Sequence, residues 1–176
     1  MIVDKKMNRK ALHLISYGLY VVTSTDGEAI NGQIVNTVMQ VASRPPTVAV
    51  SINKENLTCK YIRKSRVFAA SVLGTDAPME FIGRFGFRSG RDIDKFERVR
   101  YRTGTTGAPV VLDHALAYIE VAVAQEVDVG THVLFIGEVV DADILEEGEP
   151  MTYAYYHQVM GGKTPAKATV YVGEED

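Results

Sequence analysis

The stretch GQIVNTVMQVASRPPTVAVSINKENLT, residues 32–58, decides the fold of this 176-residue chain. It contains two runs rich in β-branched residues, which are separated by the Pro45-Pro46 pair. Such runs with turn residues between them are typical of β strands. A polar loop follows and leads into Asn56, a residue that favours helix N-caps. The stretch therefore predicts two strands joined by a turn, followed by a short helix.

The same alternation of β-type runs and short helices extends over the rest of the chain. Strands are predicted at 18–24, 29–41, 47–52, 67–73, 115–128, 132–144 and 170–172, and helices at 8–14, 56–64 and from Pro78 onward. Residues 83–96 look irregular, and 153–156 suit either a helix or a strand. The runs 115–128 and 132–144 are predicted to form a long hairpin with its turn at Gly130. There is no regular strand-helix alternation, so we expect one mostly β domain spanning 1–176, an antiparallel barrel with peripheral helices.

The composition excludes several classes of protein. The chain is 46% apolar and 23% charged with a net charge of -3, which suits a soluble domain and not a nucleic-acid binder. Its longest apolar run, 115–119, is far shorter than the roughly 18 residues of a membrane span. Cys59 is the only cysteine, so no internal disulfide is possible. We expect a protein of a reducing compartment, the cytoplasm, without a signal peptide.

Common catalytic motifs are missing from the sequence. No dinucleotide-binding GxGxxG and no hydrolase GxSxG occurs, and the P-loop-like end at 161–164 has His157 where the pattern requires glycine. The four histidines share no metal-ligand spacing. We therefore expect no metal site.

The start of the helix predicted at 56–64 is a candidate phosphate site. Ser51, Asn53, Lys54 and Thr58 bring hydroxyl, amide and ammonium groups to this point. A helix N-terminus adds unsatisfied N–H donors and a partial positive charge. The alternative is a cap at Asn56 followed by a solvated loop, and spacing alone favours that alternative.

Three other features have both a functional and a structural interpretation. Asn36 and Thr37 lie within a predicted strand, where they either face a ligand or form the outer side of the strand. The loop 81–96 combines phenylalanines, glycines and arginines, so it either covers a flat charged cofactor or is a basic surface loop. His132 begins a strand at the barrel mouth, although a surface-turn histidine is the commoner case. The aromatic cluster at 153–157 is a fourth such feature: it either stacks on a ligand or packs a subunit interface, and packing is favoured.

Taken together, five segments resemble the flavin reductase-like family, the FMN-binding split barrels. They are 36–38, 51–58, 78–87, 128–132 and 151–157, and the similarity extends from Ile15 to Tyr171. The chain is most similar to the branch of flavoredoxins, archaeal ferric reductases and flavin domains fused to rubredoxin. This resemblance implies a homodimer of six-stranded antiparallel Greek-key split barrels, with one FMN in each subunit.

The resemblance also implies roles for individual residues. Its flavin ligands are Asn36, Thr37 and Val38 at the isoalloxazine edge, Ser51, Ile52, Asn53, Lys54 and Thr58 along the ribityl phosphate, and Arg84, Phe85, Gly86 and Phe87 as the cover. His132 is expected beside the nicotinamide during hydride transfer. Ferric reductase members carry a cysteine where this chain has Ser51. Serine supplies no thiolate, so ferric reduction through a thiol at this position is not expected.

The implied activity is that of an FMN-dependent NAD(P)H oxidoreductase. Hydride from NADH or NADPH reaches the flavin, and electrons pass to free flavin, a ferric chelate or a redox protein of rubredoxin type. An FMN electron carrier of flavoredoxin type, with little nicotinamide activity, is the alternative. A small β-barrel binding module without flavin is the third interpretation.

Overall fold

An antiparallel sheet that closes on itself forms the body of the molecule. The computed structural model of the chain describes residues 7–171. The sheet strands are β1 (Tyr20–Thr25), β2 (Ile30–Val35), β3 (Val38–Ser43), β4 (Pro46–Asn53), β5 (Val67–Leu73), β8 (Ala115–Asp128) and β9 (His132–Ile144). Their order is β2-β1-β5-β8-β9-β4-β3, with antiparallel pairing throughout. The predicted fold class is confirmed.

The sheet becomes a barrel because one bent segment supplies both of its ends. β2 and β3 stand at opposite ends of the strand order, yet only Asn36 and Thr37 separate them in sequence. The strand predicted at 29–41 is therefore interrupted, and the sheet has seven strands where the family resemblance implied a six-stranded barrel. Since Asn36 and Thr37 are not in a strand, the interpretation that they form the outer side of one is wrong.

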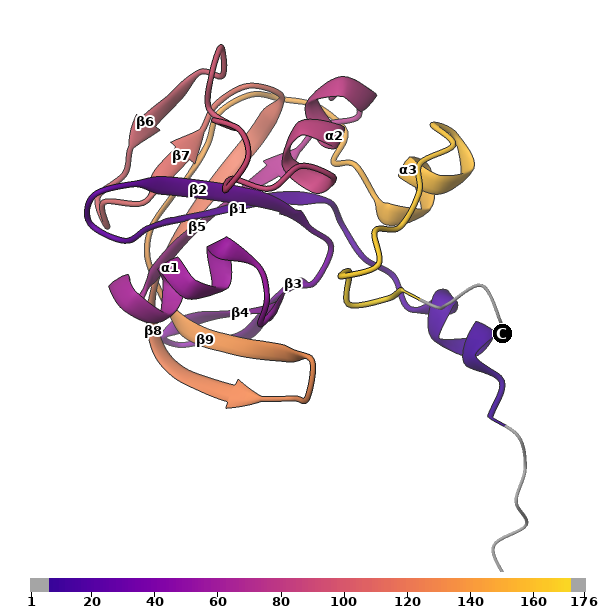
Figure 1. Cartoon of the computed structure of the whole chain (residues 1–176), viewed down its shortest axis with the longest axis horizontal. Helices are drawn as coiled ribbons and strands as arrows, with labels where there is room; N and C mark the ends of the chain where they lie inside the picture. The colour runs from indigo at the N-terminus through magenta and orange to yellow at the C-terminus, as the bar shows by residue number, and fades with distance from the viewer. Residues whose placement is uncertain (1–6, 172–176) are drawn as a thin grey trace, which may run out of the picture.

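Helix α1 (Leu57–Ser65) closes one end of the barrel (Figure 1). Its Cys59 and Ile62 are fully buried in the same core cluster as Val22, Val50 and Phe135 from the strands. This cluster fills the barrel interior. Packing of α1 against it fixes the start of the helix beside the end of β4.

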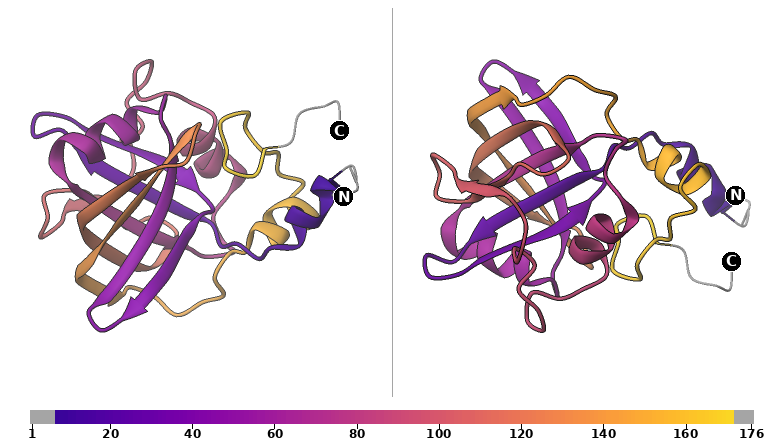
Figure 2. Two further views of the ribbon diagram at one scale, coloured as in Figure 1. Left: turned by 90° about the horizontal axis from the view of Figure 1, so that it is seen from below. Right: turned by 90° about the horizontal axis from the view of Figure 1, so that it is seen from above.

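A second apolar cluster lies outside the barrel and joins two more helices to it. Helix α2 (Met79–Gly86) contributes Phe81 and Phe85, and helix α3 (Tyr153–Gln158) contributes Tyr156. These rings pack with Leu19 at the start of β1 and with neighbouring residues. Figure 2 shows α2, α3 and the C-terminal segment on the same side of the barrel. The functional site lies at this junction.

Several elements differ from the prediction. Helix α2 continues through Gly86, so the first part of the region predicted as irregular is helical because Ile82 and Phe85 bury one face of it. A short hairpin of β6 (Tyr101–Thr103) and β7 (Pro109–Val111) was not predicted. The N-terminal helix is a 3-10 helix, Arg9–Leu14, and 153–156 lie in helix α3.

The strand predicted at 170–172 is not found in its described part, since Val170 and Tyr171 are not in a strand and Val172 lies outside the described residues. Within residues 7–171, no helix combines the length and the hydropathy that a membrane span requires.

Candidate functional site

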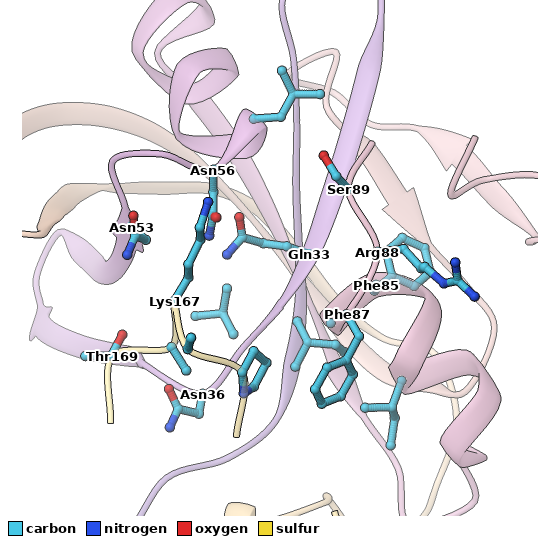
Figure 3. Close-up of a pocket in the computed structure, with 18 of the residues that line it drawn as sticks. Gln33, Asn36, Asn53, Asn56, Phe85, Phe87, Arg88, Ser89, Lys167 and Thr169 are labelled. Atoms are coloured by element: carbon cyan, nitrogen blue, oxygen red, sulfur yellow. The ribbon is translucent and has the colours of Figure 1, made fainter. Parts of the chain in front are cut away.

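A cavity of about 510 Å³ lies between the barrel, α2, α3 and the C-terminal segment (Figure 3). This volume is within the usual range for small-molecule sites. Its wall contains Leu19, residues 31 and 33–36, Ser51, Asn53, Asn56, Leu57, Ile82, residues 85–91, Lys95, His132, Tyr153, Tyr156, Lys163 and residues 165–169. The wall thus brings together the β2–β3 break, the end of β4, the start of α1 and the start of β9.

Three buried polar atoms in this cavity have no partner. Gln33 Oε1, Asn36 Nδ2 and His132 Nε2 are the buried side-chain N and O atoms that make no hydrogen bond within the described part of the chain. All three residues line the same cavity. Each such group costs about 1–3 kcal/mol when it is left unsatisfied. A ligand that offers both hydrogen-bond donors and acceptors would remove this cost.

His132 is the first residue of β9 and is only 8% exposed. Its register partner in β4 is Asn53. The Nδ1 atom lies 2.8 Å from Thr131 Oγ1, which orients the ring. Burial lowers the pKa of His132, and the adjacent backbone of Lys167 opposes this shift to a smaller extent. The imidazole is therefore neutral at pH 7.

The cavity wall is cationic. Arg88, Arg91, Lys95, Lys163 and Lys167 line it, and no aspartate or glutamate is found among the described lining residues. The Lys95 ammonium is buried and donates to Gly32 O and Phe85 O at 2.9 and 3.0 Å. Burial lowers the pKa of Lys95 to about 8. Such a wall attracts an anionic ligand.

The start of α1 has the features of an anion site. The N-cap residue Asn56 makes no side-chain capping bond, and both Asn56 and Leu57 face the cavity. The first N–H groups of a helix have no acceptor within it, so they are available to an anion. The loop 89–91 lies close by: the Arg91 guanidinium donates to Glu55 O at 3.2 Å. A Cβ at Gly90 would lie 2.0 Å from Asn31 Oδ1, so any larger residue here would require the Asn31 side chain to move.

Seven of the residues expected from the sequence line this cavity. They are Asn36, Ser51, Asn53, Phe85, Gly86, Phe87 and His132. Four different segments of the chain contribute them, and the fold brings them together around one space. Phe85 is fully buried under the cavity, whereas the Phe87 ring is 50% exposed at its edge.

The other expected residues are placed around the cavity and not in its wall. Ile52 is in the barrel core, and Val38 packs against that core. The Thr37 hydroxyl donates to Asn36 Oδ1 at 3.0 Å. Arg84 donates to Glu97 O at 2.6 Å.

Lys54 and Thr58 also have partners other than a ligand. The Lys54 ammonium lies 2.6 Å from Asp128 Oδ2 in an exposed ion pair. The Thr58 hydroxyl is fully buried and accepts from Asn31 Nδ2 at 2.9 Å. Their role in phosphate binding remains a prediction.

Sequence reasoning missed several lining residues. Asn31 and Gln33 alternate along β2, and this spacing of two polar residues was a usable signal for one face of a strand. The loop 81–96 was singled out as a possible cofactor cover, but within it Ser89, Gly90, Arg91 and Lys95 were not named as individual site residues. The C-terminal segment 163–169 has no periodic pattern, so nothing in the sequence placed it over the cavity.

Known proteins are similar to this chain over most of its length. A family model described as "Flavin reductase like domain" matches residues 12–162. The chain is 53% identical over 165 residues to "Ferric-chelate reductase (NAD(P)H)" of Archaeoglobus fulgidus, which covers 94% of this chain and 98% of that one. It is 52% identical over 170 residues to "High molecular weight rubredoxin" of Moorella thermoacetica, covering 96% of this chain and 74% of that one.

A solved structure has the same fold. The "NADH:FAD oxidoreductase SgcE6" of Streptomyces globisporus superposes with a TM-score of 0.73 at 27% identity, covering 86% of this chain and 92% of that chain. The family model extends over most of the chain, and two relatives share more than half of their aligned residues with it. The chain belongs to the flavin reductase-like family.

Proposed function

We propose that the chain is an FMN-dependent NAD(P)H oxidoreductase. The observation that carries this proposal is the meeting of three unpartnered buried polar atoms in one cation-lined cavity. A flavin nucleotide has the matching chemistry, because its ring carries both hydrogen-bond donors and acceptors and its phosphate is an anion. The relatives named as an NAD(P)H ferric-chelate reductase and an NADH:FAD oxidoreductase support the same activity.

The residues present fit FMN at both ends. Asn36 Nδ2 can donate to a ring carbonyl, and Gln33 Oε1 can accept from a ring N–H. The start of α1, the Ser89 hydroxyl and Arg91 would hold the phosphate. Bound FMN supplies the redox chemistry, since its ring accepts a hydride and releases electrons. The protein binds the FMN and orients it, and the apolar residues of the cavity wall exclude water from it.

His132 serves as the residue that positions the hydride donor. His132 lines the cavity, its Nε2 is buried without a hydrogen bond in the described part of the chain, and Thr131 Oγ1 beside Nδ1 restricts the orientation of its ring. A neutral imidazole is suited to hydrogen bonding with the uncharged carboxamide of a nicotinamide. Holding the donor in place lowers the entropic part of the barrier.

Electron delivery does not use a thiol in this chain. Ser51, the position at which the family resemblance implies a cysteine in ferric reductases, lines the cavity and offers only a hydroxyl. Cys59 is fully buried in α1, and burial raises the pKa of its thiol. A ferric chelate would therefore be reduced without a protein thiolate ligand, and free flavin or a redox protein are the other acceptors.

Partners and location are part of the proposal. Large apolar side chains are exposed on β3 and the N-terminal helix, including Met39 (48%), Val41 (48%) and Leu14 (86%), and a homodimer would bury such side chains. The Moorella relative is named a rubredoxin, so we propose a rubredoxin-like protein as one electron acceptor. The lone buried cysteine suits the cytoplasm.

A steady-state assay tests the proposed activity. FMN-loaded protein is given NADH or NADPH, together with excess FMN, a ferric chelate or a rubredoxin as acceptor. We expect nucleotide oxidation that depends on both protein and acceptor. An electron carrier of flavoredoxin type would bind FMN but would not oxidise either nucleotide with any acceptor.

FMN binding is expected to weaken as pH rises above 8. Lys95, whose pKa is lowered to about 8 by burial, loses its charge there, and a nearby phosphate would raise that pKa again. Binding then takes up a proton above pH 8, so the affinity is about tenfold lower at pH 9 than at pH 7. Fluorescence titration with FMN measures this. Riboflavin, which has no phosphate, is the control, and equal FMN affinities at both pH values would contradict the role of Lys95.

Gln33→Met is expected to stabilise the FMN-free protein and weaken flavin binding. The change removes an unsatisfied buried acceptor, which favours the folded state by about 1 kcal/mol. Urea unfolding gives the stability and titration gives the flavin affinity. Gln40→Met, at an exposed glutamine on β3, is the matched control. A less stable variant with normal flavin affinity would show that Gln33 Oε1 stabilises the folded protein and does not bind the flavin.

A further inference from the structure

The segment 163–169, called the strap below, lies across the cavity and over His132. Six of its seven residues line the cavity wall, all except Thr164. The backbone of Lys167 lies beside the His132 ring. In Figure 3 the Lys167 side chain extends over the cavity toward Asn56. The strap therefore lines the same space in which a hydride donor would have to lie to contact His132.

The strap is firmly attached at its beginning. The Tyr156 hydroxyl donates to Lys163 O at 3.0 Å, and Thr164 Oγ1 lies 3.1 Å from His157 Nε2. Both aromatic residues belong to α3. Just before this anchor, Gly161 has a φ of +68°, in the left-handed region that favours glycine. The start of the strap is therefore fixed to α3, and the turn just before it is made by a glycine whose backbone can adopt conformations that other residues rarely adopt.

Beyond its base, the strap is held weakly. None of the core clusters found in residues 7–171 includes a strap residue. Its described side-chain contacts with the barrel side are the Lys167 Nζ–Glu55 Oε2 ion pair at 2.8 Å and the Thr37 Oγ1–Thr169 Oγ1 bond at 2.9 Å, and the Lys167 backbone interacts with the His132 ring. Glu55 and Lys167 are 71% and 53% exposed, and ion pairs between such exposed groups contribute little stability.

We infer that the strap is a displaceable cover that closes the route to His132 and opens to admit the nicotinamide nucleotide, with Glu55–Lys167 as its latch. This inference rests on the proposed function for the identity of the entering molecule. The small residues Pro165, Ala166 and Ala168 let the cover lie flat without an apolar anchor. The open state exposes His132, and the closed state excludes water from the cavity.

Glu55→Gln tests the latch. Without the ion pair the strap opens more often beyond its base, so trypsin should cleave after Lys167 about two- to fivefold faster in FMN-free protein. The control is Glu97→Gln, which removes a carboxylate of similar exposure, 68%, away from the strap. Added salt should speed cleavage of the wild type toward that of Glu55→Gln. Equal cleavage of wild type and both variants would overturn the inference.

The same variants test gating in the loaded protein. We expect a lower KM for NADH or NADPH in Glu55→Gln with kcat unchanged, and wild-type values in Glu97→Gln. Faster cleavage with an unchanged KM would overturn the gating role. The cleavage measurement needs neither flavin nor nucleotide. Faster cleavage in a protein that oxidises no nucleotide would therefore support the latch and count against the proposed function and the gating of the nucleotide.

A reversible lock gives a second test. Thr37→Cys with Thr169→Cys joins two hydroxyl positions 2.9 Å apart, and the native Cys59 is buried and does not interfere. With FMN loaded before oxidation, disulfide formation should lower nucleotide oxidation at least tenfold while FMN stays bound, and reduction should restore it. Equal rates in the oxidised and reduced forms would overturn the inference.

Discussion

Changing Ser89 and Arg91 together to alanine is expected to weaken FMN binding by about 3 kcal/mol, a loss of over a hundredfold. The reason is the placement of the loop 89–91 opposite the uncapped start of α1, where Asn56 and Leu57 face the cavity. A phosphate between them would receive a hydroxyl, a guanidinium and helix N–H groups. Titration of the FMN-free variant by flavin fluorescence measures the affinity.

Two controls make this measurement decisive: riboflavin as a second ligand and Lys54→Ala as a second variant. Riboflavin has no phosphate, so its affinity should change little in the double variant. Lys54 is paired with Asp128 and lies outside the cavity wall, so its replacement should leave FMN affinity nearly unchanged if the phosphate lies beside 89–91. A large loss in Lys54→Ala, together with no loss in the double variant, would contradict our placement of the phosphate.

Replacing His132 with alanine should slow hydride transfer on the order of a hundredfold, because a donor that is not held at the flavin loses its reactive alignment. FMN should remain bound, since the phosphate and ring contacts come from other residues. Rapid mixing of FMN-loaded protein with NADH or NADPH measures the rate of flavin bleaching. Deuterium at the transferred position should slow this step in the variant as it does in the wild type.

His13→Ala is the matched control for that change. His13 is an exposed residue of the N-terminal 3-10 helix and does not line the cavity. Its replacement should leave the bleaching rate unchanged. Loss of FMN from His132→Ala with normal turnover per remaining flavin would show that His132 supports the cofactor and not the donor.

The sequence predicted the barrel well because its strands are long and strongly patterned. The runs 115–128 and 132–144 coincide with β8 and β9, and the turn lies at Gly130 as expected. The break at Asn36 and Thr37 was missed because the run 29–41 is β-branched on both sides of it. The bend depends on closure of the sheet, a tertiary effect that local propensity does not report.

The site was predictable only where motifs mark it. Asn36, Ser51 and His132 were expected at a ligand and do line one cavity. Lys95 was not singled out, because a lysine in a sequence gives no sign that it will be buried against two backbone carbonyls. The strap likewise depends on contacts between residues far apart in the chain, such as Thr37 with Thr169.

Anaerobic addition of NADH and then NADPH to FMN-loaded protein tests the central claim most directly. The account predicts a yellow protein whose visible flavin absorbance is bleached by at least one nucleotide, and bleached far more slowly in His132→Ala. A protein that binds FMN but is bleached by neither nucleotide would contradict the proposed oxidoreductase activity and would favour the alternative of an FMN electron carrier. A protein that stays colourless after FMN is added and the excess removed would contradict the flavin site itself.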